Sequence, residues 1–526
     1  MNVIRCLFLS YLLLGLLPLS ARESAYVTPE MFGAAGDGVS NDYVPFMKAI
    51  ESGRKVKCDG IYFLSSSVHP SVTKDISIEG RGTIIYDFHI NCNANLSVNG
   101  LKLTNTGKEV NGLFASKGTA LFKDVYLEGL SNCKLDGGIS FKGSSLKVES
   151  CTFDKSDINI VSKNAVFKIT NCIFDCKSVN SKDNLSNEPI HLQRCKKGVI
   201  KSCEFKNSLQ DVIDFYFGAH NVTVSNCIFD DVSTTVFEIK AEYRDNSSTI
   251  GGNQVYEDFT SNITIKDNHF RNVSAQVLFW IGTRSDERKD RSHEDHYYVR
   301  NVVICNNDIE IVADKCDVFL CRNAKDLTFK NNKISSSGSV FLFRSMSDNP
   351  YESNHYCRLI NNRITCTSSI IAYIQGHNDG LYFEGNEISH SLDDSFLILQ
   401  EPQSDINGIT FKANKNAGRT FRVGTESKTI HGKDIAFVKQ SFGSCHVGNM
   451  SGYLKYQGCS FQCKPIVSGG VNDLFVYDCD SPGFLSTGKI LRVEVKKSRL
   501  NAPLDEMVIG GSVPNNIVSK RNKKKY

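Results

Sequence analysis

The middle of the chain repeats one short pattern, in which apolar and polar residues alternate and a pair rich in Asn and Cys follows. The apolar residues recur at every second position, which is the period of a β-strand. Asn after each strand tolerates the left-handed backbone of a tight turn. The copies read LKVESCTF, FKITNCIF, VIKSCEF, VTVSNCIF, ITIKDNHF, VVICNNDI, LTFKNNKI, CRLINNRI, LYFEGNEI and ITFKANKN. Each copy predicts one strand and one turn.

The turn position recurs at the spacing of a solenoid, roughly 20 to 40 residues. Stacking the repeats would align these residues in one interior column, in which Asn bonds to neighbouring backbone and Cys acts as a small hydrophobe. The column comprises Cys151, Cys172, Cys203, Cys227, Asn268, Asn307, Asn332, Asn362, Asn386 and Asn414. We therefore predict an all-β fold, a single-stranded parallel β-helix. Stacked interior cysteines account for much of the content of 19 Cys without redox chemistry.

A second set of short strands lies between these copies and aligns without gaps. Its members are residues 138–142, 157–161, 189–193, 212–216, 236–240, 277–281, 318–322 and 340–344. Because side chains alternate faces along a strand, inward second and fourth positions leave the third and fifth positions outward. The outward third column then reads Ser140, Asn159, His191, Asp214, Glu238 and Phe279. In this alignment Trp280 points inward and belongs to the core.

The N-terminal residues read as a secretory signal peptide. Arg5 precedes an apolar run from Leu7 to Leu17, and small residues follow up to Ala21. No later apolar run approaches the ~20 residues of a membrane-spanning helix. We expect a secreted or periplasmic protein without membrane insertion.

Charge excludes a broad nucleic-acid surface. The 61 Lys and Arg residues nearly balance the 57 Asp and Glu residues, leaving a formal net charge of +4. Part of this excess lies in residues 520–525, which read as a solvated basic tail.

The segment Met31-Phe-Gly-Ala-Ala-Gly-Asp-Gly-Val-Ser-Asn-Asp42 resembles the FGAxGDGxxDD motif of the pectinase and tailspike branch of the pectate-lyase-like superfamily. The resemblance extends over about residues 26–420. It implies a right-handed β-helix whose open end is covered by a capping helix, here Tyr43 to Ile50, with Pro45 in the first turn. Asn41 departs from the acidic residue usual in that branch.

These features divide the chain into four parts. They are a signal peptide (1–21), the N-terminal motif and capping helix (22–55), the β-helix (56–510, with a weaker repeat after 420) and a basic C-terminal tail (511–526).

The outward column brings several ionisable residues together. Adjacent rungs are about 4.8 Å apart, so Asp214 and Glu238 would be neighbours, with His191 one rung away and Lys240 beside Glu238. Two such carboxylates repel, which raises one pKa or recruits a cation such as Ca²⁺ bound by Asp214 and Glu238. A plain ion-pair ladder of Glu238 with Lys240 and Arg244 is the alternative.

Further residues are candidates for binding substrate. Tyr216, Arg322 and Arg344 occupy the outward fifth position, and Arg244 follows Lys240 closely. Two long insertions, residues 242–261 and 283–300, leave the rungs at the level of the carboxylates and are expected to wall a groove.

Three functions fit this face. A lyase acting on an acidic, uronic-acid-containing polysaccharide needs a cation to neutralise the sugar carboxylate and a base to take the neighbouring proton. The chain is similar here to the β-helical alginate lyase and chondroitinase B family, which implies roles for Glu238, Lys240 and Arg284 as calcium ligand, base and arginine. The spacing departs from that family, and His191 is a competing base.

A glycoside hydrolase with Asp214 and Glu238 as the carboxylate pair is the second reading, and their spacing favours retention. Against it, the polygalacturonase-type NxD, DD, HG and RxK set is missing from the sequence. A non-catalytic glycan-binding adhesin is the third.

Overall fold

The structure is a computed structural model. It describes residues 25–501 and 517–520, apart from 88–89, 106–113, 130–137, 163, 177–187, 210, 217, 241–259, 283–297, 346–352, 368–369, 391–395, 401–404, 416–419, 424–430, 433, 448–451, 468–470 and 487–489.

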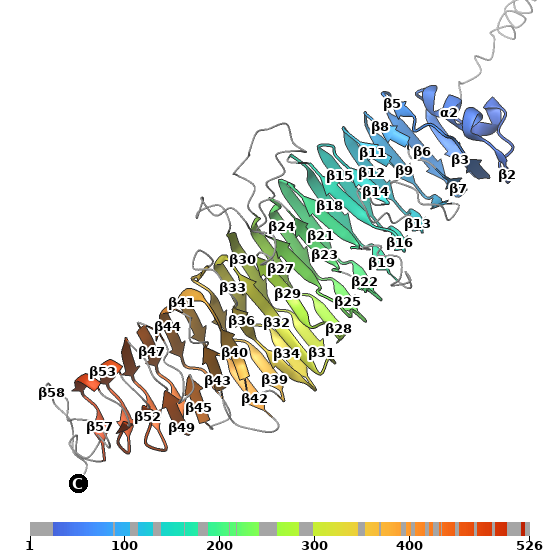
Figure 1. Cartoon of the computed structure of the whole chain (residues 1–526). Helices are drawn as coiled ribbons and strands as arrows, with labels where there is room; N and C mark the ends of the chain where they lie inside the picture. The colour runs from blue at the N-terminus through green and yellow to red at the C-terminus, as the bar shows by residue number, and fades with distance from the viewer. Residues whose placement is uncertain are drawn as a thin grey trace, which may run out of the picture.

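The chain winds into an elongated stack of rungs, and most rungs contribute strands to each of three sheets (Figure 1). Within each sheet the paired strands of the described residues are parallel, as between β20 (Ile190–Gln193) and β23 (Ile213–Tyr216). We call the sheets A, B and C in the order in which the chain visits them. The parallel β-helix that the repeat predicted is confirmed.

Sheet A comprises β1 (Tyr26–Val27), β3 (Lys55–Cys58), β6 (Ile76–Gly80), β9 (Leu96–Asn99), β12 (Thr119–Lys123), β15 (Ser145–Glu149), β18 (Val166–Thr170), β21 (Lys197–Lys201), β24 (His220–Ser225), β27 (Ser261–Lys266), β30 (Val299–Cys305), β33 (Ala324–Lys330), β37 (Ser353–His355), β38 (Arg358–Ile360), β41 (His377–Glu384), β44 (Asp405–Lys412), β46 (His431–Gly432), β47 (Asp434–Val438), β50 (Tyr453–Gln457), β53 (Val471–Tyr477), β56 (Ile490–Lys496) and β58 (Ile517–Lys520). Sheet B comprises β2 (Asp37–Asn41), β4 (Ile61–Leu64), β7 (Thr83–Tyr86), β10 (Lys102–Asn105), β13 (Tyr126–Glu128), β16 (Thr152–Asp154), β19 (Ile173–Asp175), β22 (Glu204–Lys206), β25 (Ile228–Asp230), β28 (His269–Val273), β31 (Asp308–Ile311), β34 (Lys333–Ser336), β39 (Arg363–Cys366) and β42 (Glu387–His390).

Sheet C comprises β5 (Ser71–Val72), β8 (Ile90–Cys92), β11 (Phe114–Ser116), β14 (Ile139–Phe141), β17 (Ile158–Val161), β20, β23, β26 (Phe237–Lys240), β29 (Val277–Gly282), β32 (Lys315–Arg322), β35 (Ser339–Phe341), β36 (Phe343–Ser345), β40 (Ile370–Ile374), β43 (Phe396–Gln400), β45 (Thr420–Val423), β49 (Ser444–Val447), β52 (Ile466–Val467) and β55 (Leu485–Ser486). A short fourth sheet near the C-terminal end comprises β48 (Ser441–Phe442), β51 (Ser460–Phe461), β54 (Asp480–Ser481) and β57 (Arg499–Leu500).

Stacked aromatic rings fill the interior behind sheet B. Phe153, Phe174, Phe205, Phe229 and Phe270 lie on successive rungs, with neighbouring ring centroids 4.5 to 5.0 Å apart. All five side chains are buried. Each rung cannot bury its apolar face alone, so this stack joins the rungs into one continuous core.

The predicted Cys and Asn column is confirmed. The four cysteines of the column, Cys151 to Cys227, are buried, and so are its six asparagines, Asn268 to Asn414. Each Asn amide bridges rungs: Asn332 Nδ2 donates to Ile304 O at 3.1 Å, and its Oδ1 accepts from the Asn307 backbone N–H at 3.0 Å. The column satisfies buried polar groups that the turns would otherwise leave without partners.

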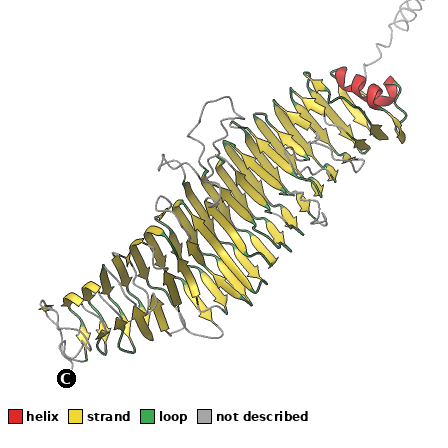
Figure 2. Ribbon diagram, viewed as in Figure 1, coloured by secondary structure: helices red, strands yellow, loops and turns green. Residues whose placement is uncertain are grey.

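One helix, α2 (Tyr43–Glu51), follows the short 3₁₀ helix η1 (Pro29–Phe32) at the end of the stack opposite the C-terminus (Figure 2). Pro45 lies in the first turn of α2, as predicted, and Asp42 accepts hydrogen bonds from the backbone N–H groups of Ala35 and Gly36 at 2.7 and 3.0 Å. The role of α2 as a cap stays a prediction, as do the part boundaries. Among the described residues, no helix is long and apolar enough to cross a membrane.

The register of β29 corrects one prediction. Glu238 is opposite Trp280, not Phe279, so Trp280 lies on the outward column and Phe279 points inward. The buried Phe279 ring stacks on Phe237 with centroids 5.5 Å apart, which fixes the register. A one-residue slip moves every side chain of a strand to the other face, and the gapless alignment missed it.

Candidate functional site

The outward column of sheet C gathers the predicted ionisable residues. His191 on β20 is opposite Asp214 on β23, which is opposite Glu238 on β26. Lys240 follows on β26, two residues after Glu238 and therefore on the same face. The predicted neighbourhood of these four residues is confirmed; their chemical roles stay predictions. With Glu188 and Asp211, described below, we call them the acidic cluster.

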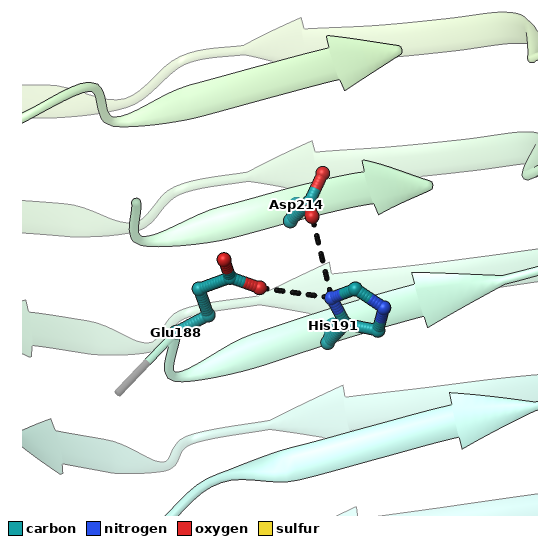
Figure 3. A group of neighbouring side chains, drawn as sticks. All are labelled: Glu188, His191 and Asp214. Atoms are coloured by element: carbon teal, nitrogen blue, oxygen red, sulfur yellow. Dashed lines mark hydrogen bonds and ion pairs between the residues drawn. The ribbon is translucent and has the colours of Figure 1, made fainter. Parts of the chain in front are cut away.

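His191 lies between two carboxylates (Figure 3). Its Nδ1 is 2.8 Å from Glu188 Oε2 and 3.3 Å from Asp214 Oδ2. Burial lowers the pKa of His191, but the hydrogen bonds to Asp214 and Glu188 outweigh it and raise the pKa to about 10. At neutral pH His191 is therefore a cation that holds both carboxylates, and it is not a base.

Lys240 bridges the two buried carboxylates. Its Nζ is 3.1 Å from Asp214 Oδ2 and 2.9 Å from Glu238 Oε2, and all three side chains are at least nine-tenths buried. Two carboxylates at this distance stabilise the charged ammonium. The ion pair of Glu238 with Lys240 in the alternative reading is thus present, and Arg244 lies outside the described residues.

The same geometry tests the expected calcium site. An ion shared by Asp214 and Glu238 would need the position that the Lys240 ammonium occupies, so this pair does not fit Ca²⁺. Glu188, His191 and Asp214 offer three ligand atoms within 4.8 Å of one another. However, the His191 nitrogen in that group is the one that faces both carboxylates as a hydrogen-bond donor, and a protonated nitrogen does not bind a metal.

Asp211 completes the cluster, and the sequence reasoning missed it. It precedes β23, is partly exposed, and forms a side-chain hydrogen bond with Glu238. Burial, this hydrogen bond and nearby carboxylates raise the pKa of Asp211 to about 9. Burial also raises the pKa of Asp214, whose Oδ1 has no hydrogen-bond partner among the described residues. With a pKa of about 9, the Asp211 carboxyl group is expected to carry a proton at neutral pH.

Glu188 was also missed, although both residues left a signal. Glu188 and Asp211 precede their strands by two residues, Glu188 before β20 and Asp211 before β23. Carboxylates at the same position on adjacent rungs belong to one face. The strand alternation pointed only to residues inside the strands.

Arginines and aromatic rings continue the outward face of sheet C on later rungs. The Arg322 guanidinium lies 5.7 Å from the centroid of the Trp280 ring, and Arg344 lies 5.7 Å from that of Tyr373. Arg344 Nη1 also donates to Asp317 Oδ2 at 3.0 Å. We call Trp280, Arg322, Arg344 and Tyr373 the arginine–aromatic strip.

Two of these positions differ from the alignment. Arg344 is opposite Leu320, in the third column, two residues from its predicted place. A shift of two preserves the face, so its outward direction is confirmed, whereas Trp280 had been assigned to the core. Arg322 lies in the fifth column, opposite Gly282, as predicted.

The remaining predicted positions are only partly covered. Arg284 lies outside the described residues, as do almost all residues of the two insertions, the signal peptide and the end of the basic tail. The backbone of Tyr216 pairs with Gln193, and its side chain lies outside the description.

No family model matches the chain, and no curated protein matches its sequence. Several solved structures are similar in shape. The pre-mature bacteriophage phi29 gene product 12 is 12% identical, with 90% of this chain and 69% of that chain covered and a TM-score of 0.43. The Dettilon tailspike protein is 13% identical, with 69% and 66% covered and a TM-score of 0.45. A Yersinia enterocolitica family 28 exopolygalacturonase is 11% identical, with 78% of each chain covered and a TM-score of 0.35.

At such identities and TM-scores, these likenesses carry no conclusion about activity. The strand pairing itself establishes the parallel β-helix that the resemblance to the pectate-lyase-like superfamily implied.

Proposed function

We propose that this protein is a glycoside hydrolase that cleaves an acidic polysaccharide at the acidic cluster of sheet C. The observation that carries the proposal is the side-chain hydrogen bond between Asp211 and Glu238, in a group of carboxylates where burial raises the pKa of Asp211 to about 9. A carboxyl group that keeps its proton at neutral pH is the general acid that glycosidic cleavage requires.

Asp211 donates its proton to the glycosidic oxygen as the bond between that oxygen and the anomeric carbon breaks. Glu188, partly exposed and held by His191, accepts a proton from the water that attacks the anomeric carbon. In this step Asp211 becomes a carboxylate and Glu188 becomes a carboxylic acid, so the number of protons on the pair is unchanged. The proposed catalytic pair is therefore Asp211 and Glu188. Asp214 and Glu238, the pair expected from the sequence, are buried and bound to Lys240.

The buried residues support the pair electrostatically. The ammonium of Lys240 forms ion pairs with Asp214 and Glu238. The hydrogen bond to Glu238 favours the protonated form of Asp211. No step uses calcium. The N-terminal apolar segment supports an activity in the periplasm or outside the cell.

The acidic nature of the substrate rests on the arginine–aromatic strip. Arg322 is buried against Trp280, and among the described residues its Nε has no hydrogen-bond partner and its guanidinium forms no ion pair. A sugar carboxylate or sulfate would satisfy such a group, and the rings offer apolar surface to a sugar.

Elimination by a lyase is the second candidate, and the same strip favours it because a lyase also acts on acidic sugars. It needs a neutral base, however. The Lys240 ammonium is bound between Asp214 and Glu238, and the pKa of His191 is raised to about 10. We therefore rank hydrolysis first.

The test is an incubation with polygalacturonate, alginate, chondroitin sulfate and a neutral glucan. Hydrolysis yields new reducing ends without the ultraviolet absorbance of unsaturated uronides, whereas elimination yields both. Reducing ends with that absorbance would replace hydrolysis by the lyase reading. If no polymer yields a product, both enzymatic functions are refuted, and non-catalytic glycan binding by an adhesin is the function that fits.

The Asp211→Asn variant tests the assigned acid. We expect it to lower kcat by about 10² to 10⁴, the usual contribution of a general acid. Asp231→Asn is the matched control, because Asp231 is an exposed residue with φ 55°, which Asn adopts readily. Equal loss in both variants, or none in Asp211→Asn, would remove Asp211 from the mechanism.

A further inference from the structure

In sheet A, β41 pairs with β38 on one side and with β44 on the other. β41 and β44 lie side by side in the C-terminal half of the stack (Figure 1), and a hollow lies over these three strands. The hollow is a cavity of about 450 Å³. Its lining includes Tyr356, Arg358, Gly380, Tyr382, Gly408 and Thr410. We call it the sheet A groove. It belongs to a different sheet from the acidic cluster and contains none of its residues.

The groove forms where a column of Asn side chains ends. On earlier rungs Asn221, Asn262 and Asn301 occupy one bend of sheet A with φ between 53° and 57°, and their amides bond to one another at 3.0 and 2.7 Å. The register continues this column through Asp326, Tyr356, Gly380 and Gly408, all with positive φ. Two glycines thus stand where earlier rungs carry side chains, and they leave the floor open.

Tyr356 forms one wall of the groove. Its side chain is 49% exposed, and a Cβ on Gly380 would lie 2.9 Å from its ring carbon Cδ1. Only a glycine at that position lets the ring lie against the next rung without displacement. At Gly408, by contrast, a Cβ would meet nothing within 4 Å. The open floor therefore continues beyond the ring.

Two charged residues, Arg358 and Glu384, line the groove. Arg358 is exposed, and no ion pair or hydrogen bond of its guanidinium is present within the described part of the chain. The Glu384 carboxylate lies 2.6 Å from Lys412 Nζ and is balanced by it, so Arg358 is the charged group of the lining that is left to bind an anion. An aromatic wall beside an unoccupied guanidinium fits a sugar that carries a carboxylate or a sulfate.

From these features we propose that the sheet A groove is a second binding site for an acidic polysaccharide, separate from the site of cleavage. The proposal rests on the proposed function, because the polymer is taken to be the same. The rung of Tyr356 lies four rungs beyond that of Glu238, or about 19 Å along the axis at about 4.8 Å a rung. Holding a long polymer at a second site raises its effective concentration at the first.

The experiment is affinity electrophoresis of the full chain in gels that contain polygalacturonate, chondroitin sulfate or dextran. The chain carries Asp211→Asn in every arm, so that the polymer stays intact. We expect acidic polymers to retard the protein and dextran not to. Adding Tyr356→Ala or Arg358→Gln should weaken the binding of one acidic polymer about tenfold, which corresponds to about 1.4 kcal/mol.

Gly408→Asn supplies a test that should preserve the backbone conformation, because Asn residues adopt the same left-handed bend on earlier rungs. It restores the residue that earlier rungs carry at this bend, and it places a side chain over the open floor. We expect the same loss of retardation. Asp326→Asn, at the same bend outside the groove, is the control and should bind like the parent. If circular dichroism shows that Gly408→Asn does not fold, the retardation of Arg358→Gln decides whether the groove binds the polymer.

Retardation that survives Tyr356→Ala, Arg358→Gln and Gly408→Asn would overturn the proposal, and so would equal retardation by dextran. Self-association that Tyr356→Ala abolishes would also overturn it, because the groove would then join two copies. Cleavage of short oligosaccharides by the parent chain is measured separately. A chain that binds through the groove but cleaves nothing would refute the proposed function alone.

Discussion

Asp211 and Glu238 are joined by a side-chain hydrogen bond within the acidic cluster. Burial of Asp211, its hydrogen bond to Glu238 and the nearby carboxylates favour the protonated form of Asp211 and raise its pKa to about 9. Lys240 Nζ lies 2.9 Å from Glu238 Oε2, so Glu238 contacts a cation as well as Asp211. Asp211 is therefore the member of the pair that is expected to carry a proton at neutral pH.

The pH profile of activity follows from this pair. We expect kcat/KM for an acidic oligosaccharide to stay level near neutral pH and to fall as the pH rises through about 9, because Asp211 then loses its proton. Initial rates between about pH 6 and 10 measure it. A fall centred below about pH 7 would contradict the assignment of Asp211 as the acid.

His191 links pH to stability. Its folded-state pKa of about 10 lies above the ordinary value of 6.5, so its contribution is fully present below pH 6.5 and is lost as the pH rises towards 10. We expect the free energy of unfolding to decrease over this window. In His191→Gln the decrease should be smaller, and urea unfolding at several pH values measures both. An identical pH dependence in the two proteins would show that His191 titrates normally.

Single residues also mark the limit of the sequence reasoning. Alternation placed His191, Asp214, Glu238 and Lys240 on one face, because a strand fixes faces by parity alone. It assigned Trp280 to the wrong face. One additional residue before a strand exchanges the inward and outward positions, and the alternation alone does not reveal that residue. Only the packing of Phe279 on Phe237 decides that register, and it is a contact between rungs that a sequence pattern does not contain.

At the scale of elements, the turn between sheets A and B is built in two ways. The Cys rungs fill the interior by volume, whereas the Asn rungs make directional bonds to two neighbours. The repeat revealed both kinds from sequence because the residue recurs at one position. Asp211 and Glu188 were missed since they lie before their strands, where the alternation of side chains between faces does not apply.

The two kinds of rung should respond differently to truncation. Asn332→Ala removes an acceptor from Asn307 and a donor from Ile304 O and Asn362 Oδ1, and all of these groups are buried. We expect a loss of about 3 kcal/mol in the free energy of unfolding. Cys203→Ala removes one buried sulfur and should lose about 1 kcal/mol. Urea titrations of both variants compare them, and equal losses would mean that the Asn bonds add nothing beyond volume.

The whole molecule is a stack in which each rung contacts only its neighbours. Stability in such a solenoid is approximately a sum of rung terms and nearest-neighbour terms, so a local defect should open locally. The acidic cluster and the sheet A groove lie on different rungs and different sheets. Changes in one should therefore leave the fold of the other intact, which is why the two sites can be tested separately.

Hydrogen exchange of Asn332→Ala tests this view of the molecule. The lost bonds connect the rungs of β30, β33 and β38, so amides there should exchange about a hundredfold faster, as a loss of about 3 kcal/mol implies. Amides of α2 lie far along the stack and should keep the exchange rates of the parent. Cys203→Ala, several rungs nearer to α2, is the control and should produce a small change centred on β21 and β24. If Asn332→Ala instead accelerates α2 and β33 equally, the stack unfolds as one cooperative unit, and distant substitutions would then reach the catalytic face through global stability.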